Sequence, residues 1–167
     1  MSSISMYRAS VPVFIRILNN LSAILDKAVV YADAKKIDHT TLLTARLAPD
    51  MFHFTRQVQI VTDHAKGCVS RLAGVDIPKY EDNEASFAEL KDRIARTLEY
   101  LQTFKPEQID GSEDKDIVLK MGANTREFKG LDYLLNNATL NVYFHYTSAY
   151  AILRHNGLDI GKRDYIG

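Results

Sequence analysis

Residues 54–74, FTRQVQIVTDHAKGCVSRLAG, carry the pattern that decides the fold. Their apolar side chains recur in alternating steps of four and three, at Phe54, Val58, Val61, Ala65, Cys68 and Leu72. This spacing places one continuous apolar seam along a helix, which is typical of a helix packed lengthwise in a bundle. We expect this helix to begin near Pro49. It should end at Gly74, because glycine readily adopts the left-handed conformation that follows many helices.

The preceding segment, from about Val11 to Ala34, also has helical spacing. Its apolar stripe recurs in steps of three and four and comprises Phe14, Ile17, Leu18, Leu21, Ile24, Leu25, Ala28 and Ala32. We expect Ser10 to cap this helix and Pro12 to lie in its opening turn, where a missing N–H costs little. Residues 39–48, HTTLLTARLA, predict a short helix that ends before Pro49.

Two more helices follow in the second half of the chain. Ser86 and Glu89 have the spacing of a capping box. The seam behind them consists of Phe87, Leu90, Ile94, Leu98, Leu101 and Phe104, and it stops before Pro106. A last helix runs from about Thr139 to His155, with Gly157 just past its end. The sequence therefore predicts an all-α fold, a four-helix bundle.

The connection between the third and fourth helices lacks helical spacing. Residues 116–130, DIVLKMGANTREFKG, alternate between apolar and polar side chains on either side of a glycine turn. We expect a small β-hairpin inserted between the two helices, from about residue 116 to 130.

Composition limits the class of protein. The chain is 46% apolar and 25% charged, an ordinary globular profile, so we expect residues 1–167 to form one domain. Its 21 basic and 21 acidic side chains cancel, which argues against nucleic acid or a membrane surface as a partner. Cys68 is the only cysteine, so no intramolecular disulfide forms. Because neither a signal peptide nor a membrane span is recognisable, we expect a cytoplasmic protein.

His145 is the polar residue that calls for an explanation. It lies in residues 141–157, NVYFHYTSAYAILRHNG, on the same side of the helix as Val142, Ala149 and Ile152. A buried ring without a partner costs about 1–3 kcal/mol. Three interpretations stay open, namely a structural hydrogen bond, a metal-free ligand pocket and a metal site.

The other histidines are candidate partners only one at a time. His155 follows His145 by ten residues, which separates them by about 15 Å along the helix. His53 and His64 lie eleven residues apart, about 16 Å along their helix, so they cannot share one ion either. One of His53, Gln57 or His64 can face His145, and the choice depends on the helix register.

Five motifs resemble a known family. They are SVPVFIRILNNLSAIL, LAPDMFHFTRQVQI, AKGCVSRLAG, FHYTSAYAILRHNG and IGKRDYIG, at residues 10–25, 47–60, 65–74, 144–157 and 160–167. Together they are similar to uncharacterised proteins of the DinB/YfiT-like superfamily of metalloenzymes, over nearly the whole chain. The resemblance implies a DinB-like bundle with up-down-down-up topology. Residues 74–85 can span about 40 Å when extended, enough to let the third helix run parallel to the second.

The resemblance also implies a type of site. Many members hold a divalent metal with one histidine from the second helix and a His-x-x-x-His pair on the fourth, and some activate a small thiol for transfer. His145 matches the first member of the pair, whereas the second position is Ala149. We therefore expect a small-molecule pocket at Gln57, His145 and Ala149. For zinc, nickel or iron, the candidate ligands are His145, His64 and His53, an incomplete triad.

Two functions follow as hypotheses. The first is a pocket between the second and fourth helices around His145 that binds a small molecule, with a degenerate metal-dependent transferase-type site as its enzymatic form. The second is a non-catalytic, oligomeric structural or stress-related bundle in which His145 only fixes helix register. Whether the protein is an enzyme stays open.

Two further expectations concern surfaces. Val13, Ile17 and Ile24 widen the stripe of the first helix, so we expect a homodimer. The tail after Gly157 retains several apolar residues, so we expect it to fold back and to bury Ile160 and Tyr165. If the tail lies near His145, it would act as a lid.

Overall fold

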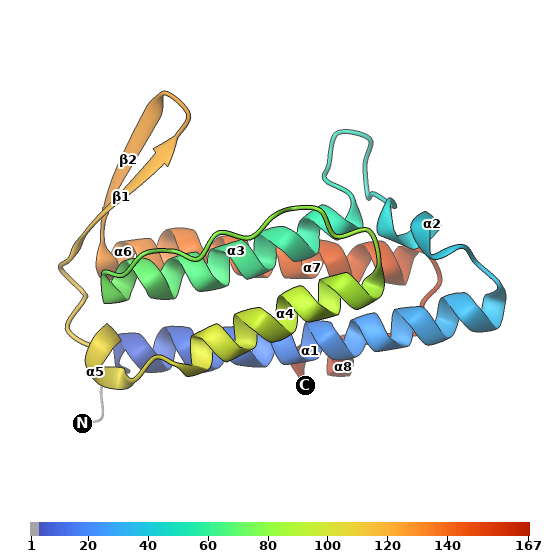
Figure 1. The fold of residues 1–167 in the computed structure, drawn as a ribbon, viewed down its shortest axis with the longest axis horizontal. Helices are drawn as coiled ribbons and strands as arrows, with labels where there is room; N and C mark the ends of the chain where they lie inside the picture. Colours follow the sequence, from blue (N-terminus) through green and yellow to red (C-terminus); the bar gives the residue numbers. More distant parts are fainter. Residues whose placement is uncertain (1–3) are drawn as a thin grey trace.

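The computed structural model describes residues 4–167 and places four long helices side by side (Figure 1). These are α1 (Met6–Lys35), α3 (Phe54–Ala73), α4 (Phe87–Gln102) and α7 (Thr139–His155). Followed along the chain, α1 and α7 run in one direction, and α3 and α4 run in the other. The bundle therefore has the expected up-down-down-up order. The crossover of residues 74–86 passes along the bundle, which makes α4 parallel to α3.

Helix α1 begins earlier than its apolar stripe suggests. Ser5 is the N-cap, and its hydroxyl accepts a hydrogen bond from the Arg8 N–H at 3.3 Å. The prediction of Ser10 as the cap is wrong, because Ser10 is buried inside the helix and donates to the Met6 carbonyl at 2.7 Å. Pro12 also lies inside the helix, with its ring exposed. All eight residues of the predicted stripe are buried.

Helix α3 is shorter at its start than predicted. It begins at Phe54 rather than near Pro49, because His53 caps it by accepting the Arg56 N–H at Nδ1. Its end at Gly74 is as predicted, with a left-handed φ of 76°. The six residues of its apolar seam are all buried. The short helix expected before it is α2 (His39–Leu43).

The prediction that Ser86 caps α4 is confirmed, whereas Glu89 accepts the N–H of Ala85, one residue before the donor of a standard capping box. The Ser86 hydroxyl accepts the Glu89 N–H at 3.2 Å, and the Glu89 carboxylate accepts the Ala85 N–H at 2.6 Å. Helix α4 ends before Phe104, and Pro106 opens a separate short helix, α5 (Pro106–Ile109).

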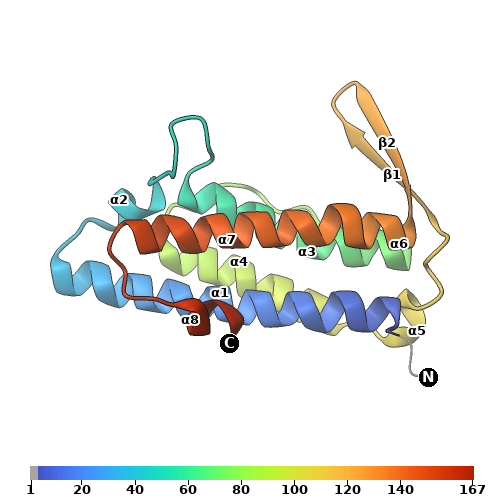
Figure 2. The ribbon, with the colours of Figure 1, turned by 180° about the vertical axis from the view of Figure 1, so that it is seen from behind.

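The predicted hairpin is present and projects from one end of the bundle in both ribbon views (Figures 1 and 2). Strands β1 (Asp116–Met121) and β2 (Asn124–Lys129) pair antiparallel. The turn between them includes Gly122 at a φ of 61°. Buried Ile117 ties the hairpin to the core, as a lone hairpin requires.

Sequence analysis did not predict the helical segment that leads into α7. Helix α6 (Gly130–Tyr133) passes into a π-helical turn, η1 (Leu134–Ala138), which continues directly into α7. Gly130 is required at the start, because a Cβ there would lie 1.9 Å from the Ser112 carbonyl oxygen.

The tail folds back along the bundle, as predicted. Leu158 and Ile160 are buried, and the last residues form α8 (Lys162–Ile166) against α1 (Figure 2). Tyr165 is half-buried and stacks on Tyr146, with ring centroids 4.2 Å apart. Within residues 4–167, no helix combines the length and apolarity that crossing a membrane requires.

Candidate functional site

A cavity of about 370 Å³ lies where α3 faces α7. Its lining comprises Arg56, Ile60, Asp63, His64, Arg71 and His145. Only His145 comes from α7, and the others recur on one face of α3. No residue of the tail lines this cavity, so α8 is not a lid over His145.

The hydrogen bond between His145 and Gln57 fixes the state of the imidazole. His145 Nδ1 lies 2.7 Å from Gln57 Oε1. The Gln57 amide nitrogen donates to the Phe52 carbonyl at 3.0 Å, which leaves the amide oxygen facing the ring. An amide oxygen only accepts, so Nδ1 carries the proton. In the neutral ring, Nε2 therefore keeps its lone pair.

Both histidines of the cavity favour the neutral form. Burial lowers the pKa of His145, and the positive charge of Arg56 lowers it further. Burial also lowers the pKa of His64 to about 4, with His145 and Arg71 adding to the shift. The rings are nearly parallel, with an interplanar angle of 12° and centroids 6.1 Å apart. At neutral pH the cavity therefore presents two uncharged imidazoles.

A balanced charge network borders the two rings. Arg93, with no exposed surface, donates to Asp63 at 2.8 Å, to Glu84 at 3.0 Å and to the Thr62 hydroxyl at 2.7 Å. The linked ion pairs contain three cations and three carboxylates, namely Arg56, Lys66, Arg93, Asp63, Asp82 and Glu84. The charges of Arg56 and Asp63 are thus compensated within this network.

Arg71 is the cation of the cavity that lies outside that network. Its guanidinium donates to the Tyr133 hydroxyl at 3.0 Å. Burial raises the pKa of Tyr133 to about 12, so this partner is neutral. Gly67 leaves room for the guanidinium, because a Cβ there would lie 2.7 Å from its Nη1. The cavity is therefore left with a net positive charge.

A family model spans almost all of these elements. It is described as a domain of unknown function, DUF1993, and it matches residues 6–166. The chain belongs to the DUF1993 family. This DUF1993 chain is also similar to a crystal structure described as a DinB family member protein from Shewanella denitrificans. The two are 42% identical with a TM-score of 0.88, over 96% of this chain and 91% of the other. No curated protein matches the sequence.

The structure brings together some of the predicted site residues of this DUF1993 protein. Gln57 and His64 both face His145, where sequence analysis expected one partner from α3. Ala149 is buried one turn beyond His145 on the same side of α7. His53 is occupied at the start of α3 as its N-cap.

The donor set around His145 differs from the three-histidine site that the superfamily resemblance implies. Catalytic zinc sites use about three protein ligands. Among the described residues, no three His, Cys, Asp or Glu side chains gather closely enough to hold an ion. His64 and His145 supply two imidazoles, and Ala149 supplies no third. The residues present do not fit the three-histidine site that the superfamily resemblance implies.

Sequence reasoning missed the contribution of Arg93 and Arg71. The signal for Arg93 was its position on the apolar face of α4, between Leu90 and Ile94. Its partners come from α3 and from the crossover, which periodicity does not place in space.

Cys68 is inert here, because complete burial raises its pKa and disfavours the thiolate.

Proposed function

We propose that the protein binds a small anionic molecule in the cavity between α3 and α7, around His64 and His145. The observation that carries this proposal is the tautomer of His145, fixed by Gln57 with a lone pair left on Nε2. The ligand would donate a hydrogen bond to Nε2 and place its negative charge near Arg71.

The electrostatics support an anion over a neutral ligand. Asp63, the carboxylate of the cavity, is neutralised by Arg93 and Lys66 at 2.8 and 2.7 Å. Arg71 has a neutral hydrogen-bond partner, so its charge acts on whatever enters. The attraction between Arg71 and an anionic ligand is stronger in a partly buried site, where the effective dielectric constant is lower than in water.

Three probes of similar size test the required groups. Lactate carries an anion and a hydroxyl donor, propionate carries the anion alone, and propane-1,2-diol carries donors alone. We expect lactate to shift the NMR resonance of His145 Nε2 most strongly, with millimolar affinity. Equal shifts for all three probes would contradict the assignment of Arg71 and Nε2 to separate groups of the ligand.

Two variants separate these roles. In His145→Asn the side-chain amide can still donate to Gln57, while the acceptor at Nε2 is lost, so the preference for lactate over propionate should disappear. In Arg71→Gln the preference of the site for anions should disappear. Arg96→Gln, on the exposed side of α4, is the matched control.

A second function rests on the same hydrogen bond. The contact of His145 with Gln57 joins α7 to α3 and would by itself fix the register of a non-catalytic, oligomeric bundle. In that case none of the probes binds, and sedimentation of the chain shows a stable oligomer.

Elemental analysis of protein purified without a histidine tag tests the hypothesis of a metal-dependent transferase-type site, which predicts stoichiometric zinc, nickel or iron.

A further inference from the structure

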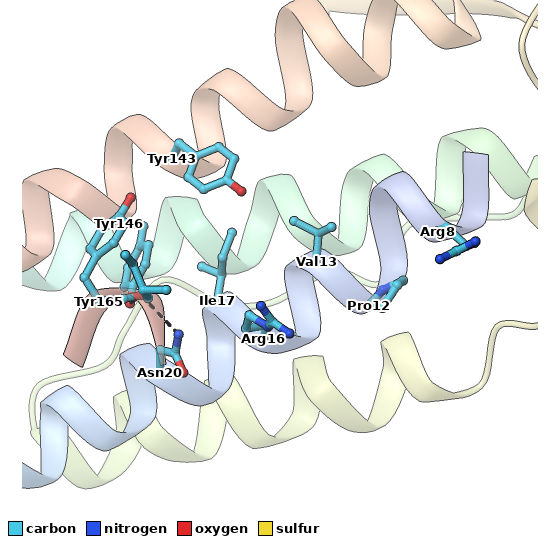
Figure 3. Close-up of a pocket in the computed structure, with 10 residues that line it drawn as sticks. Arg8, Pro12, Val13, Arg16, Ile17, Asn20, Tyr143, Tyr146 and Tyr165 are labelled. Carbon is cyan, nitrogen blue, oxygen red and sulfur yellow. Dashed lines mark hydrogen bonds between the residues drawn. The ribbon is translucent and has the colours of Figure 1, made fainter. Parts of the chain in front are cut away.

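A second cavity lies on the opposite side of α7, between α7, α1 and α8 (Figure 3). Its volume is about 530 Å³, compared with 370 Å³ for the histidine cavity. Small-molecule sites typically occupy about 300–1,000 Å³. Tyr146, the residue after His145, lines this second cavity, which we name the α1–α7 groove.

The walls of the α1–α7 groove are apolar and aromatic. Val13 and Ile17 of α1 form one side, and Tyr143 and Tyr146 of α7 form the other (Figure 3). Tyr165 of the tail closes one end by stacking on Tyr146. Tyr143 is 40% exposed to solvent, so much of its ring remains available for contact.

The closed end is held in place by hydrogen bonds. The carbonyl of Tyr165 accepts the Tyr146 hydroxyl at 2.8 Å and the Asn20 amide at 3.0 Å. Lys27 forms an ion pair with Asp164 at 2.5 Å, which ties α8 to α1. The α1–α7 groove is therefore formed before any ligand arrives, which reduces the ordering cost of binding.

The charged side chains that line the α1–α7 groove are all positive. Arg8 and Arg16 line it, and no aspartate or glutamate does. Within residues 4–167, neither guanidinium forms an ion pair with a carboxylate, in contrast to Arg93. Eight residues separate them on α1, a distance of about 12 Å along the helix axis. A negative group at the rim can thus meet one arginine while the rest of the ligand lies on the apolar wall.

We propose that the α1–α7 groove binds an amphipathic carboxylate. Its aliphatic body would pack against Ile17 and Tyr143, and its carboxylate would pair with Arg16 or Arg8. Complementary charge favours this occupant over an uncharged or cationic amphiphile. The proposal is independent of the function assigned to His145, because the two cavities share no lining residue.

Decanoate is the probe, used with the full chain below its micelle-forming concentration. Isothermal titration calorimetry should show one decanoate bound per chain, and decyltrimethylammonium, with the same chain and the opposite charge, should bind at least tenfold more weakly. The double variant Arg8→Gln/Arg16→Gln should lose about tenfold in decanoate affinity. Arg126→Gln, in the hairpin, is the control and should bind as the wild type does.

Two results would overturn the proposal. The first is equal affinity for the two amphiphiles, or wild-type affinity in the double arginine variant. The second is a dimer in sedimentation that decanoate does not affect and that Tyr143→Ala dissociates, because a second copy would then occupy the α1–α7 groove. His145→Asn should bind decanoate normally, which distinguishes failure here from failure of the histidine site.

Discussion

The arginines on the two sides of α7 differ in burial: Arg93 on the α3 side is fully buried, whereas Arg8 and Arg16 on the α1 side are exposed. Towards α3, the charges of Arg56 and Asp63 are compensated by a network of ion pairs, and His145 is held in one tautomer. Towards α1, three tyrosine rings and an apolar wall meet two arginines without compensating carboxylates. On the α3 side, Arg71 is the cavity cation without an ion-pair partner, and a ligand there would also have to match the fixed tautomer of His145. On the α1 side, charge is the main feature that a ligand would have to match.

The largest expected effect on stability comes from removing Arg93, the buried cation of the ion-pair network. Arg93→Met keeps an unbranched side chain in the core but leaves Glu84, whose side chain is 4% exposed, without its ion-pair partner and with only the Gln59 amide as a side-chain donor. Removing one member of a buried ion pair costs about 3–5 kcal/mol. We expect the melting temperature to fall by about 10 °C or more, measured by circular dichroism. Arg96→Met, an exposed position on the same helix, should change it little; similar losses in both variants would show that the network adds nothing.

The pH dependence of stability sharpens the account of the α3 side. The pKa of His64 is about 4 in the folded chain and 6.5 in the unfolded one, so only the unfolded chain takes up the proton between these values. The free energy of unfolding should therefore fall as pH drops from 6.5 towards 4, by up to about 3 kcal/mol from this residue.

Urea unfolding of the wild type and of His64→Gln at pH 7 and pH 4.5 measures that contribution. The variant should lose less stability than the wild type over this range. His155→Gln, exposed at the end of α7, should behave as the wild type. Parallel pH profiles for the wild type and His64→Gln would refute a buried, neutral His64.

Removing the last six residues tests the α1 side. Truncation after Gly161 deletes α8 and the stack of Tyr165 on Tyr146 while keeping Leu158 and Ile160. An aromatic pair contributes about 0.5–1.5 kcal/mol, so the melting temperature should fall by a few degrees. Decanoate binding should weaken in the same protein, whereas the lactate response of His145 should persist. Loss of both responses would mean that the two sides of α7 are not independent.

The smallest effect on stability is expected from Gln57→Glu. A carboxylate still accepts the Nδ1 proton of His145, and its negative charge favours the imidazolium, so the pKa of His145 should rise. An NMR titration of the ring measures this shift. The unfolding free energy should fall by about 1 kcal/mol, because the substitution also removes the hydrogen bond from the Gln57 amide to the Phe52 carbonyl. An unchanged titration would indicate that Gln57 does not control the protonation of His145. Gln102→Glu, exposed at the end of α4, is the control.

Periodicity in the sequence was sufficient for most of the fold. The spacing of apolar residues located α7 at its observed bounds and the seams of α1 and α3, because helix packing depends on which face is apolar. It misplaced the start of α1, because Pro12 resembled a first-turn proline although Met6 and Val11 extend the buried face. The π-helical turn lacked a signal in apolar spacing alone.

The candidate site was predictable only in part. His145 stood out as a polar residue on an apolar face, and Gln57 and His64 were among its possible partners. Their contact depends on the register between α3 and α7, which is set by packing along the whole interface. Arg93 escaped notice because an arginine on a seam is interpretable only when its carboxylates, brought by the crossover, are known.

The π-helical turn at Leu134–Ala138 contains one residue more than an ordinary helical turn, and it therefore changes the rotational register between α6 and α7. An α-helix advances by about 100° per residue. Deleting one residue from this turn would restore an ordinary helical register and would rotate α6 and the hairpin by about that angle relative to His145. The extra residue thus sets the direction in which the hairpin projects. Insertions or losses there would redirect the hairpin and would also move Tyr133 of α6 relative to Arg71, so this turn links the hairpin to the histidine cavity.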